Sequence, residues 1–182
     1  MAISKLYAWL GEIPNLPKMV AEAVKLGKLD TTEIPGPKSN PEILKLAKEA
    51  GVSSIYKNDD TAWCAIAATV LALRAGKKVN FTGYSRLRAI SFTEFGTRVG
   101  IPVLGDVLVF KRDGGFHVGL YIGEDLTCYH VAGGNQGNQY SIVRIEKIRL
   151  LQARRPEYSI LMPKTAVRMW LTSKGEISKN EA

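Results

Sequence analysis

Apolar positions follow two different periods along the chain, and the change of period predicts an α+β fold. Residues 41–50 and 61–75 carry apolar side chains at helical spacing. From Val103 onward, short runs of branched and aromatic residues alternate with turn sequences such as KRDGG and GGNQGN. We expect strands in VLGDVLVF, FHVGLYIG, TCYHVAG and QYSIVRI, joined as an antiparallel meander with the helices packed on one face.

The helix boundaries are expected from capping residues. The first helix should begin with Asn40 as its N-cap and Pro41 at its first position, and end at Gly51. The second should end before Gly76, and its N-cap candidates are Asp59, Asp60 and Thr61. This second helix is apolar nearly all round, so we expect it to be the buried central helix. Residues 3–27 predict one or two further short helices, interrupted by prolines.

Composition and net charge limit the classes of protein to which the chain can belong. With 182 residues, 46% of them hydrophobic, the chain can bury one sizeable core. No apolar run approaches the roughly 20 residues of a membrane span, and MAISKLYAWLGEI lacks the features of a secretory signal. We therefore expect synthesis in the cytoplasm and no transmembrane segment. The net charge of +8 favours a polyanionic partner, but the basic residues are scattered and no nucleic-acid motif is present, so we expect no nucleic-acid partner.

Two residues indicate thiol chemistry. Cys64 lies near the expected start of the central helix, and His117 lies in the strand FHVGLYIG. A helix dipole and an adjacent imidazolium both stabilise a thiolate, which makes such a cysteine nucleophilic at neutral pH. Strand alternation places His117, Gly119 and Tyr121 on one face. If the sheet lies against the start of the helix, His117 can serve first as the base and then as the acid.

A third polar group would orient the imidazole of this histidine. The turn GGNQGNQ follows the next strand, and Asn135 or Gln136 could fill the role; we favour Asn135. The alternative is that this turn carries Asn and Gly because hairpins need positive φ. Tyr56, Trp63 and Gln136 are our candidates for substrate contact, although ordinary packing is the common role of such aromatic residues.

Other interpretations of the same residues stay open. An isolated cysteine in an alanine-rich helix is often only a small buried hydrophobic residue. His130 competes with His117 for the role of base. Together with Cys64 and Cys128 the two histidines would make a Cys2His2 set, but Cys128 and His130 lie two apart in one strand, which is not a usual zinc spacing. We expect neither a metal nor another cofactor. A Cys64–Cys128 disulfide is a further alternative.

Four motifs occur in a set order along the chain. They are Trp63-Cys64, Gly105-Asp106-Val107, His117-Val118-Gly119 and Gly133-Gly134-Asn135-Gln136. In this order they resemble the papain-like cell-wall cysteine hydrolases of bacteria and phages, the NlpC-like and CHAP group, and above all its small endolysin-type members. The resemblance covers about residues 30–156. It departs from the family at Ala65-Ile66, where NlpC-like members have Ser-Gly, and at Gly133, where CHAP members tend to be acidic.

The resemblance implies a papain-like fold in which the central helix carries the cysteine and packs on the meander. It implies Cys64 as nucleophile, His117 as base and Asn135 as the orienting residue. It divides the chain into an N-terminal helical extension (1–29), a catalytic domain (30–156) and a C-terminal extension (157–182).

The implied function is peptidoglycan hydrolysis, by cleavage of an amide bond in or next to the stem peptide. We expect the protein to act at the bacterial cell wall, in the periplasm, after release by a separate holin. A bacterial antagonistic effector with the same chemistry, restrained by an immunity protein, is the nearest alternative. A non-catalytic module that binds wall glycan or nucleic acid is an alternative of another class.

Overall fold

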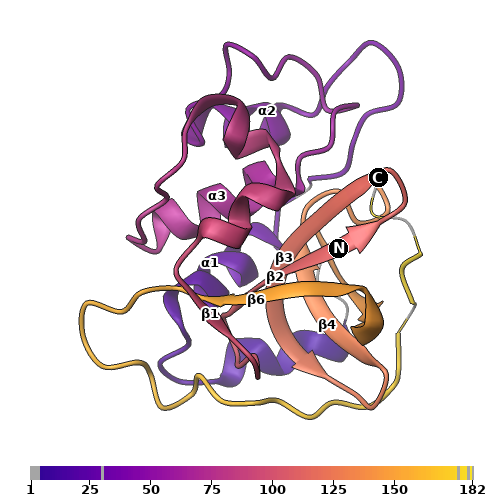
Figure 1. Ribbon diagram of the computed structural model, residues 1–182. Helices are drawn as coiled ribbons and strands as arrows, with labels where there is room; N and C mark the ends of the chain where they lie inside the picture. The colour runs from indigo at the N-terminus through magenta and orange to yellow at the C-terminus, as the bar shows by residue number, and fades with distance from the viewer. Residues whose placement is uncertain (1–4, 30, 176, 180, 182) are drawn as a thin grey trace.

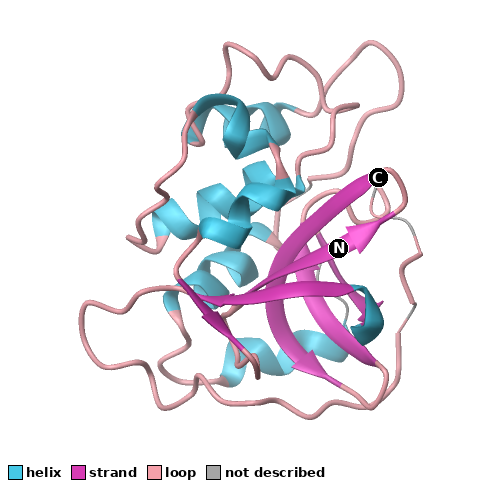
Figure 2. Ribbon diagram, in the orientation of Figure 1, coloured by secondary structure: helices cyan, strands magenta, loops and turns pink. Residues whose placement is uncertain are grey.

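A layer of helices packs against one curved antiparallel sheet (Figure 1). The computed structural model describes residues 5–29, 31–175, 177–179 and 181. Most of the helices gather on one side of the strands, as Figure 2 shows by colour, and further cyan turns lie below and beside the strands. The expected α+β class and antiparallel sheet are therefore confirmed.

Two of the expected helices form where their apolar stripes predict. The first is α2 (Pro41–Glu49), whose N-cap Asn40 accepts a hydrogen bond from the Glu42 N–H at 2.9 Å. The second is α3 (Cys64–Arg74), which is buried along its first nine residues, as expected of a central helix. Gly51 and Gly76 follow the two helices with φ of 71° and 69°, a conformation that glycine adopts without steric cost.

The predicted N-cap of α3 is wrong. The helix begins at Cys64 with Trp63 as N-cap, and no side chain caps it. Asp59 is fully buried instead, and its carboxylate accepts hydrogen bonds from the Ile34 and Asn40 N–H groups at 3.2 and 2.7 Å. The Asp59 carboxylate, which the local sequence predicts as a helix cap, therefore stabilises the loop that contains residues 34 and 40 instead.

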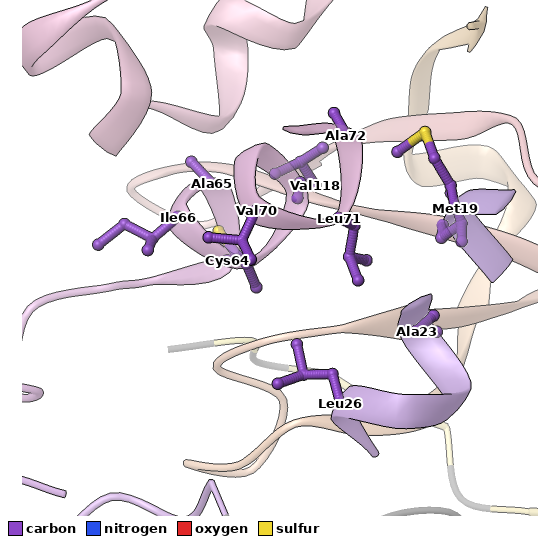
Figure 3. Close-up of a cluster of buried hydrophobic side chains, with 14 of the residues drawn as sticks. Met19, Ala23, Leu26, Cys64, Ala65, Ile66, Val70, Leu71, Ala72 and Val118 are labelled. Carbon is purple, nitrogen blue, oxygen red and sulfur yellow. The ribbon is translucent and has the colours of Figure 1, made fainter. Parts of the chain in front are cut away.

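The N-terminal segment belongs to the same core as α3. It forms a 3-10 helix, η1 (Lys5–Glu12), and then α1 (Lys18–Leu26). Figure 3 shows Met19, Ala23 and Leu26 of α1 directed towards the side chains of α3. These residues lie in one hydrophobic cluster with Cys64 and Val118, so the N-terminal extension shares the core of the central region.

The sheet of the described chain has six strands in the order β1-β6-β2-β3-β4-β5. The strands are β1 (Thr97–Val99), β2 (Val107–Arg112), β3 (Gly115–Glu124), β4 (Cys128–Gly133), β5 (Ser141–Glu146) and β6 (Leu150–Arg155). The meander β2-β3-β4-β5 confirms the expectation. β1 and β6 were not expected from the sequence, because their side chains are mostly half-buried or exposed and lack clear alternation. Short 3-10 helices η2 (Gly83–Leu87), η3 (Ala89–Glu94) and η4 (Lys147–Arg149) connect the elements.

Alternation along β3 gives the sheet two distinct faces. Val118, Leu120 and Ile122 join the core shared with α3, whereas Tyr121 joins a second apolar cluster. His117 pairs across the sheet with Phe110, a member of that second cluster. His117 therefore lies on the face opposite Val118, as its position in the strand predicts.

The chain after β6 returns to the sheet and contacts β3 and β5. The N–H of Leu171 donates to the Glu124 carbonyl at 2.8 Å, and Ile177 forms a parallel bridge with Arg144 of β5. The yellow C-terminal part is visible along the side of the sheet in Figure 1. Among the described residues no helix has the length and apolarity needed to span a bilayer.

Candidate active site

Cys64 opens α3 at the point where the helix meets β3 (Figure 3). Its side chain is buried, and burial raises the pKa of the thiol. Hydrogen bonds from the backbone at Val118 and Ala65, together with the positive charge of Arg112, oppose that rise. Burial is the larger effect, so the sulfur is a thiol at neutral pH.

His117 is fully buried and has one occupied and one free ring nitrogen. Its Nε2 lies 3.0 Å from Oε1 of Gln136. Its Nδ1 is buried and has no hydrogen-bond partner. Burial lowers the pKa of His117 to about 4, although Glu181 and Gln136 act in the opposite direction. The imidazole is neutral at pH 7, with an acceptor available to take a proton.

Gln136 fixes the tautomer of this histidine. Its Nε2 donates to the carbonyls of Val131 and Ser141, at 3.1 and 2.7 Å. The amide oxygen must therefore face His117, and Nε2 of the ring must carry the hydrogen. Nδ1 is then the basic nitrogen. The orienting contact that we expected from Asn135 is made by Gln136.

Asn135 has another place in the structure. It occupies the left-handed region with φ of 59°, as the hairpin-turn alternative predicts, and its Nδ2 donates to the Glu181 carbonyl at 3.0 Å. The preceding Gly134 lies against Trp63, since a Cβ there would be 2.5 Å from the indole ring. The Gly-Gly-Asn-Gln turn is thus shaped by packing on Trp63 and by the contact to His117.

The Cys64 side chain lies against β3 next to His117 but on the opposite face of the sheet, so the expected contact between the two side chains is not formed. The thiol contacts the backbone of Val118, the residue after the histidine, and Arg112 acts electrostatically on both groups. Cys64, Val118 and Gly133 line a cavity of only about 10 Å³. A Cβ on Gly133 would lie 3.3 Å from the His117 Nε2. The space around the thiol is too small for a substrate in this state.

The two aromatic candidates for substrate contact are buried and support the loop before α3. The Tyr56 hydroxyl donates to the Thr61 carbonyl at 3.0 Å, and the indole of Trp63 donates to the Glu33 carboxylate at 2.8 Å. Both side chains are at most 2% exposed. As buried side chains with these partners they contribute to packing, the common role of such aromatic residues, rather than to an accessible surface.

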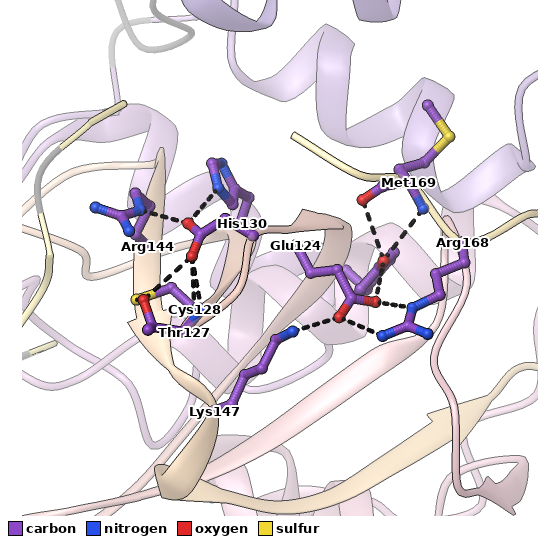
Figure 4. A network of polar contacts seen from close by, with 10 residues as sticks. Glu124, Thr127, Cys128, His130, Arg144, Lys147, Arg168 and Met169 are labelled. Carbon is purple, nitrogen blue, oxygen red and sulfur yellow. Dashed lines mark hydrogen bonds and ion pairs between the residues drawn. The ribbon is translucent and has the colours of Figure 1, made fainter. Parts of the chain in front are cut away.

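His130 belongs to a separate hydrogen-bonded cluster with Tyr7, Asp125 and Arg144. His130 lies between the Tyr7 hydroxyl at 2.7 Å and the Asp125 carboxylate at 3.1 Å, and Arg144 pairs with the same carboxylate at 2.7 Å (Figure 4). Both ring nitrogens are occupied, so His130 has no nitrogen free to act as a base. Cys64 and Cys128 are separate free thiols. Among the described residues no group of three or more His, Cys, Asp or Glu could hold a metal ion.

Sequence reasoning missed the charged residues around His117. Arg149 of η4 forms a two-pronged ion pair with Glu181, at 3.0 and 2.5 Å, and both residues act electrostatically on His117. Neither residue belongs to a recognisable motif, and 32 positions separate them in the chain. Only the path of the chain around the sheet brings them to the site.

Comparison with protein-family models, with curated proteins and with solved structures found no match.

Proposed function

We propose that the protein is a papain-like cysteine peptidase or amidase that cleaves an amide bond in or next to the stem peptide of peptidoglycan. The observation that carries this proposal is the state of His117. Its Nε2 is held by Gln136, while Nδ1 is a buried acceptor without a hydrogen-bond partner, in the strand whose Val118 contacts the thiol at the start of α3. A cysteine at a helix start, a base with a fixed tautomer and an orienting amide are the three groups that thiol hydrolysis needs.

In the proposed reaction the Cys64 sulfur attacks the carbonyl carbon of the scissile amide. Nδ1 of His117 takes the thiol proton and then delivers it to the leaving amine as the C–N bond breaks. Water, deprotonated by the same nitrogen, hydrolyses the resulting thioester and regenerates the thiol. Backbone N–H groups at the start of α3 are suited to stabilise the oxyanion.

Because the Cys64 and His117 side chains lie on opposite faces of β3, the mechanism requires this part of the fold to rearrange when substrate binds. Catalytic hydrogen bonds are often absent before substrate binds and form in the reactive complex. Arg112 and the N-terminal end of α3 favour a thiolate once water or substrate enters. The active form is then the one in which the Cys64 thiol and the His117 Nδ1 approach each other.

Digestion of purified peptidoglycan tests the proposal. Wild type should release soluble stem-peptide fragments, and mass spectrometry of those fragments identifies the bond. Cys64→Ala should release none, whereas the matched variant Cys128→Ala, which removes the other buried thiol, should remain active. Equal release by wild type and Cys64→Ala, or release by neither, would contradict the proposed chemistry.

Action at the bacterial wall follows from the same proposal, with a holin as the release partner of a phage lysin. An antagonistic effector would use identical residues, and a cognate immunity protein would then bind over the cleft. The burial of Cys64 and His117 also favours a second candidate, a non-catalytic module that keeps the fold to bind wall glycan. Binding of insoluble wall by Cys64→Ala, without hydrolysis by wild type, would support that candidate.

A further inference from the structure

The chain leaves β6 as a loop, residues 157–163, whose tip consists of exposed apolar side chains. Ile160 and Leu161 are 80% and 93% exposed, and Met162 follows them at 40%. In Figure 1 this loop belongs to the orange stretch after β6 that projects at the left of the molecule. Single exposed apolar side chains are common on protein surfaces, whereas a run of them at a projecting tip indicates a contact surface.

Both ends of this loop are anchored to the body of the protein. Lys77, which follows α3, donates from Nζ to the Glu157 carbonyl at 2.6 Å. The same ammonium lies 3.9 Å from the centre of the Tyr158 ring. At the other end the Thr165 hydroxyl donates to the Asn15 carbonyl at 2.7 Å. The tip is thus held in position by contacts that do not use its apolar side chains.

The apolar tip and a group of lysines line the same cavity, of about 420 Å³. Lys18, Lys77 and Lys78 supply the cations, and Glu157 is the acidic residue among the described residues of the lining. Burial lowers the pKa of Lys77, and the charge of Lys18 acts in the same direction, against Glu157. The two ammonium groups repel each other, so a bound anion would relieve that repulsion.

An apolar tip beside lysines matches the chemistry of a bilayer that contains anionic phospholipids. Such a bilayer presents phosphate groups at its surface and acyl chains directly beneath them. Binding to it strengthens with the apolar area that enters the acyl region and with the number of lysines near the phosphates. Tyrosine rings are enriched at the level of the headgroups, which fits the half-buried Tyr158 at the base of the tip. The net charge of +8 adds a general attraction to the same surface.

We propose that residues 157–163 bind the surface of a bilayer that contains anionic phospholipids. Ile160 and Leu161 enter the acyl region, and the three lysines bind headgroup phosphates in the cavity. The proposal does not rest on the hydrolase chemistry, since it uses neither Cys64 nor His117 and is measured without peptidoglycan.

Vesicle flotation tests the proposal. Wild type should float with vesicles of phosphatidylcholine and phosphatidylglycerol, and much less with phosphatidylcholine alone. The double variant Ile160→Ser, Leu161→Ser should lower the partition coefficient at least about fivefold, because it removes the apolar area that enters the bilayer. Leu126→Ser is the matched control, since Leu126 is 87% exposed in the turn between β3 and β4 and lies outside the cavity lining. It should stay within about twofold of wild type.

The lysines are tested in the same assay. Lys18→Gln and Lys78→Gln should each lower the partition coefficient about fivefold. Added salt should weaken binding of wild type more than binding of either variant. Lys57→Gln, which replaces an exposed lysine in the loop before α3, is the control and should stay within about twofold. Lys18 and Lys78 are exposed, so thermal melts of both variants should match wild type.

A fluorescence measurement locates the tip in the bilayer. Leu161→Trp should be quenched by lipids brominated on their acyl chains, more strongly than the tryptophans of wild type. Failure of wild type to float with anionic vesicles would overturn the proposal, as would equal flotation by wild type and the Ile160→Ser, Leu161→Ser variant. A dimer that this double variant abolishes, in a protein that binds no vesicles, would overturn it in favour of a contact between two copies.

Discussion

His117 and His130 are both buried in the same sheet, yet their hydrogen-bonding surroundings differ. Burial lowers the pKa of each. His130 has partners on both nitrogens, Tyr7 and Asp125, so nothing remains for chemistry. His117 has one partner, Gln136, and one free nitrogen. The unfilled acceptor, rather than burial or pKa, is what distinguishes a candidate catalytic histidine from a structural one.

Replacement of each histidine by glutamine should separate the two roles most strongly. His117→Gln removes the proposed base and should lower wall hydrolysis at least about a thousandfold. His130→Gln should leave hydrolysis near the wild-type rate while destabilising the fold by about 2 kcal/mol, because Tyr7 and Asp125 lose a buried partner. Fragment release and urea denaturation measure the two effects. Similar activity in both variants would remove the distinction between them.

The buried cluster of Tyr7, Asp125, His130 and Arg144 should lose more stability when a charge is removed than any exposed ion pair does. Asp125 and Arg144 are 4% and 8% exposed, so Asp125→Asn leaves a buried guanidinium unpaired. We expect a loss of about 4 kcal/mol in the free energy of unfolding. Glu42→Gln is the control, because its pair with Lys45 is exposed and 3.7 Å long, and it should cost less than about 0.5 kcal/mol. Equal losses would show that Asp125 is not part of a tight cluster.

Lowering the pH should reduce the free energy of unfolding, because folding favours the neutral form of both buried histidines. The pKa of His117 falls from 6.5 in the unfolded chain to about 4 in the folded protein. The neutral form is favoured by folding, so its contribution is complete above pH 6.5 and is lost as pH falls towards 4. The loss for His117 is about 3 kcal/mol. Thermal melts between pH 7.5 and 4 should show the decline, and His117→Gln should flatten it; an unchanged slope in that variant would exclude His117 as its source.

Below pH 4 we expect the titration of Glu124, the last residue of β3, to determine how stability depends on pH. Lys147 and Arg168 hold the pKa of Glu124 down at about 2, against burial, and Figure 4 shows both cations at its oxygens. Its stabilisation is present above pH 4.5 and is lost as pH falls through 2. Glu124→Gln should therefore reduce the acid dependence below pH 4 without affecting the slope between pH 6.5 and 4.

The smallest expected effects come from Gln136 and Asn135, which are neighbours in the Gly-Gly-Asn-Gln turn. Gln136→Leu removes the partner of His117 Nε2 and should lower hydrolysis about thirtyfold. Asn135→Gly keeps a residue that adopts the observed φ of 59° and should lower it no more than about twofold. The reverse order of effects would restore Asn135 as the orienting residue.

The expectations that succeeded were local ones. The N-cap Asn40 and the apolar stripe before Gly51 predict α2, and alternation predicts the meander, because each depends on residues within one element. The failures involve distant partners. Asp59 looked like a helix cap but binds the backbone of residues 34 and 40, and β6 pairs with β2 only through a long return of the chain.

By itself the sequence determined the class of fold, the position of Cys64 at a helix start and the strand face of His117. Hydrophobic periodicity and strand alternation encode these features within a few residues. Only the tertiary structure decided which side chain of the turn meets the imidazole, and that Asn135 meets Glu181, which pairs with Arg149. Those contacts depend on how the chain closes around the sheet, and no local pattern records a partner 32 positions away.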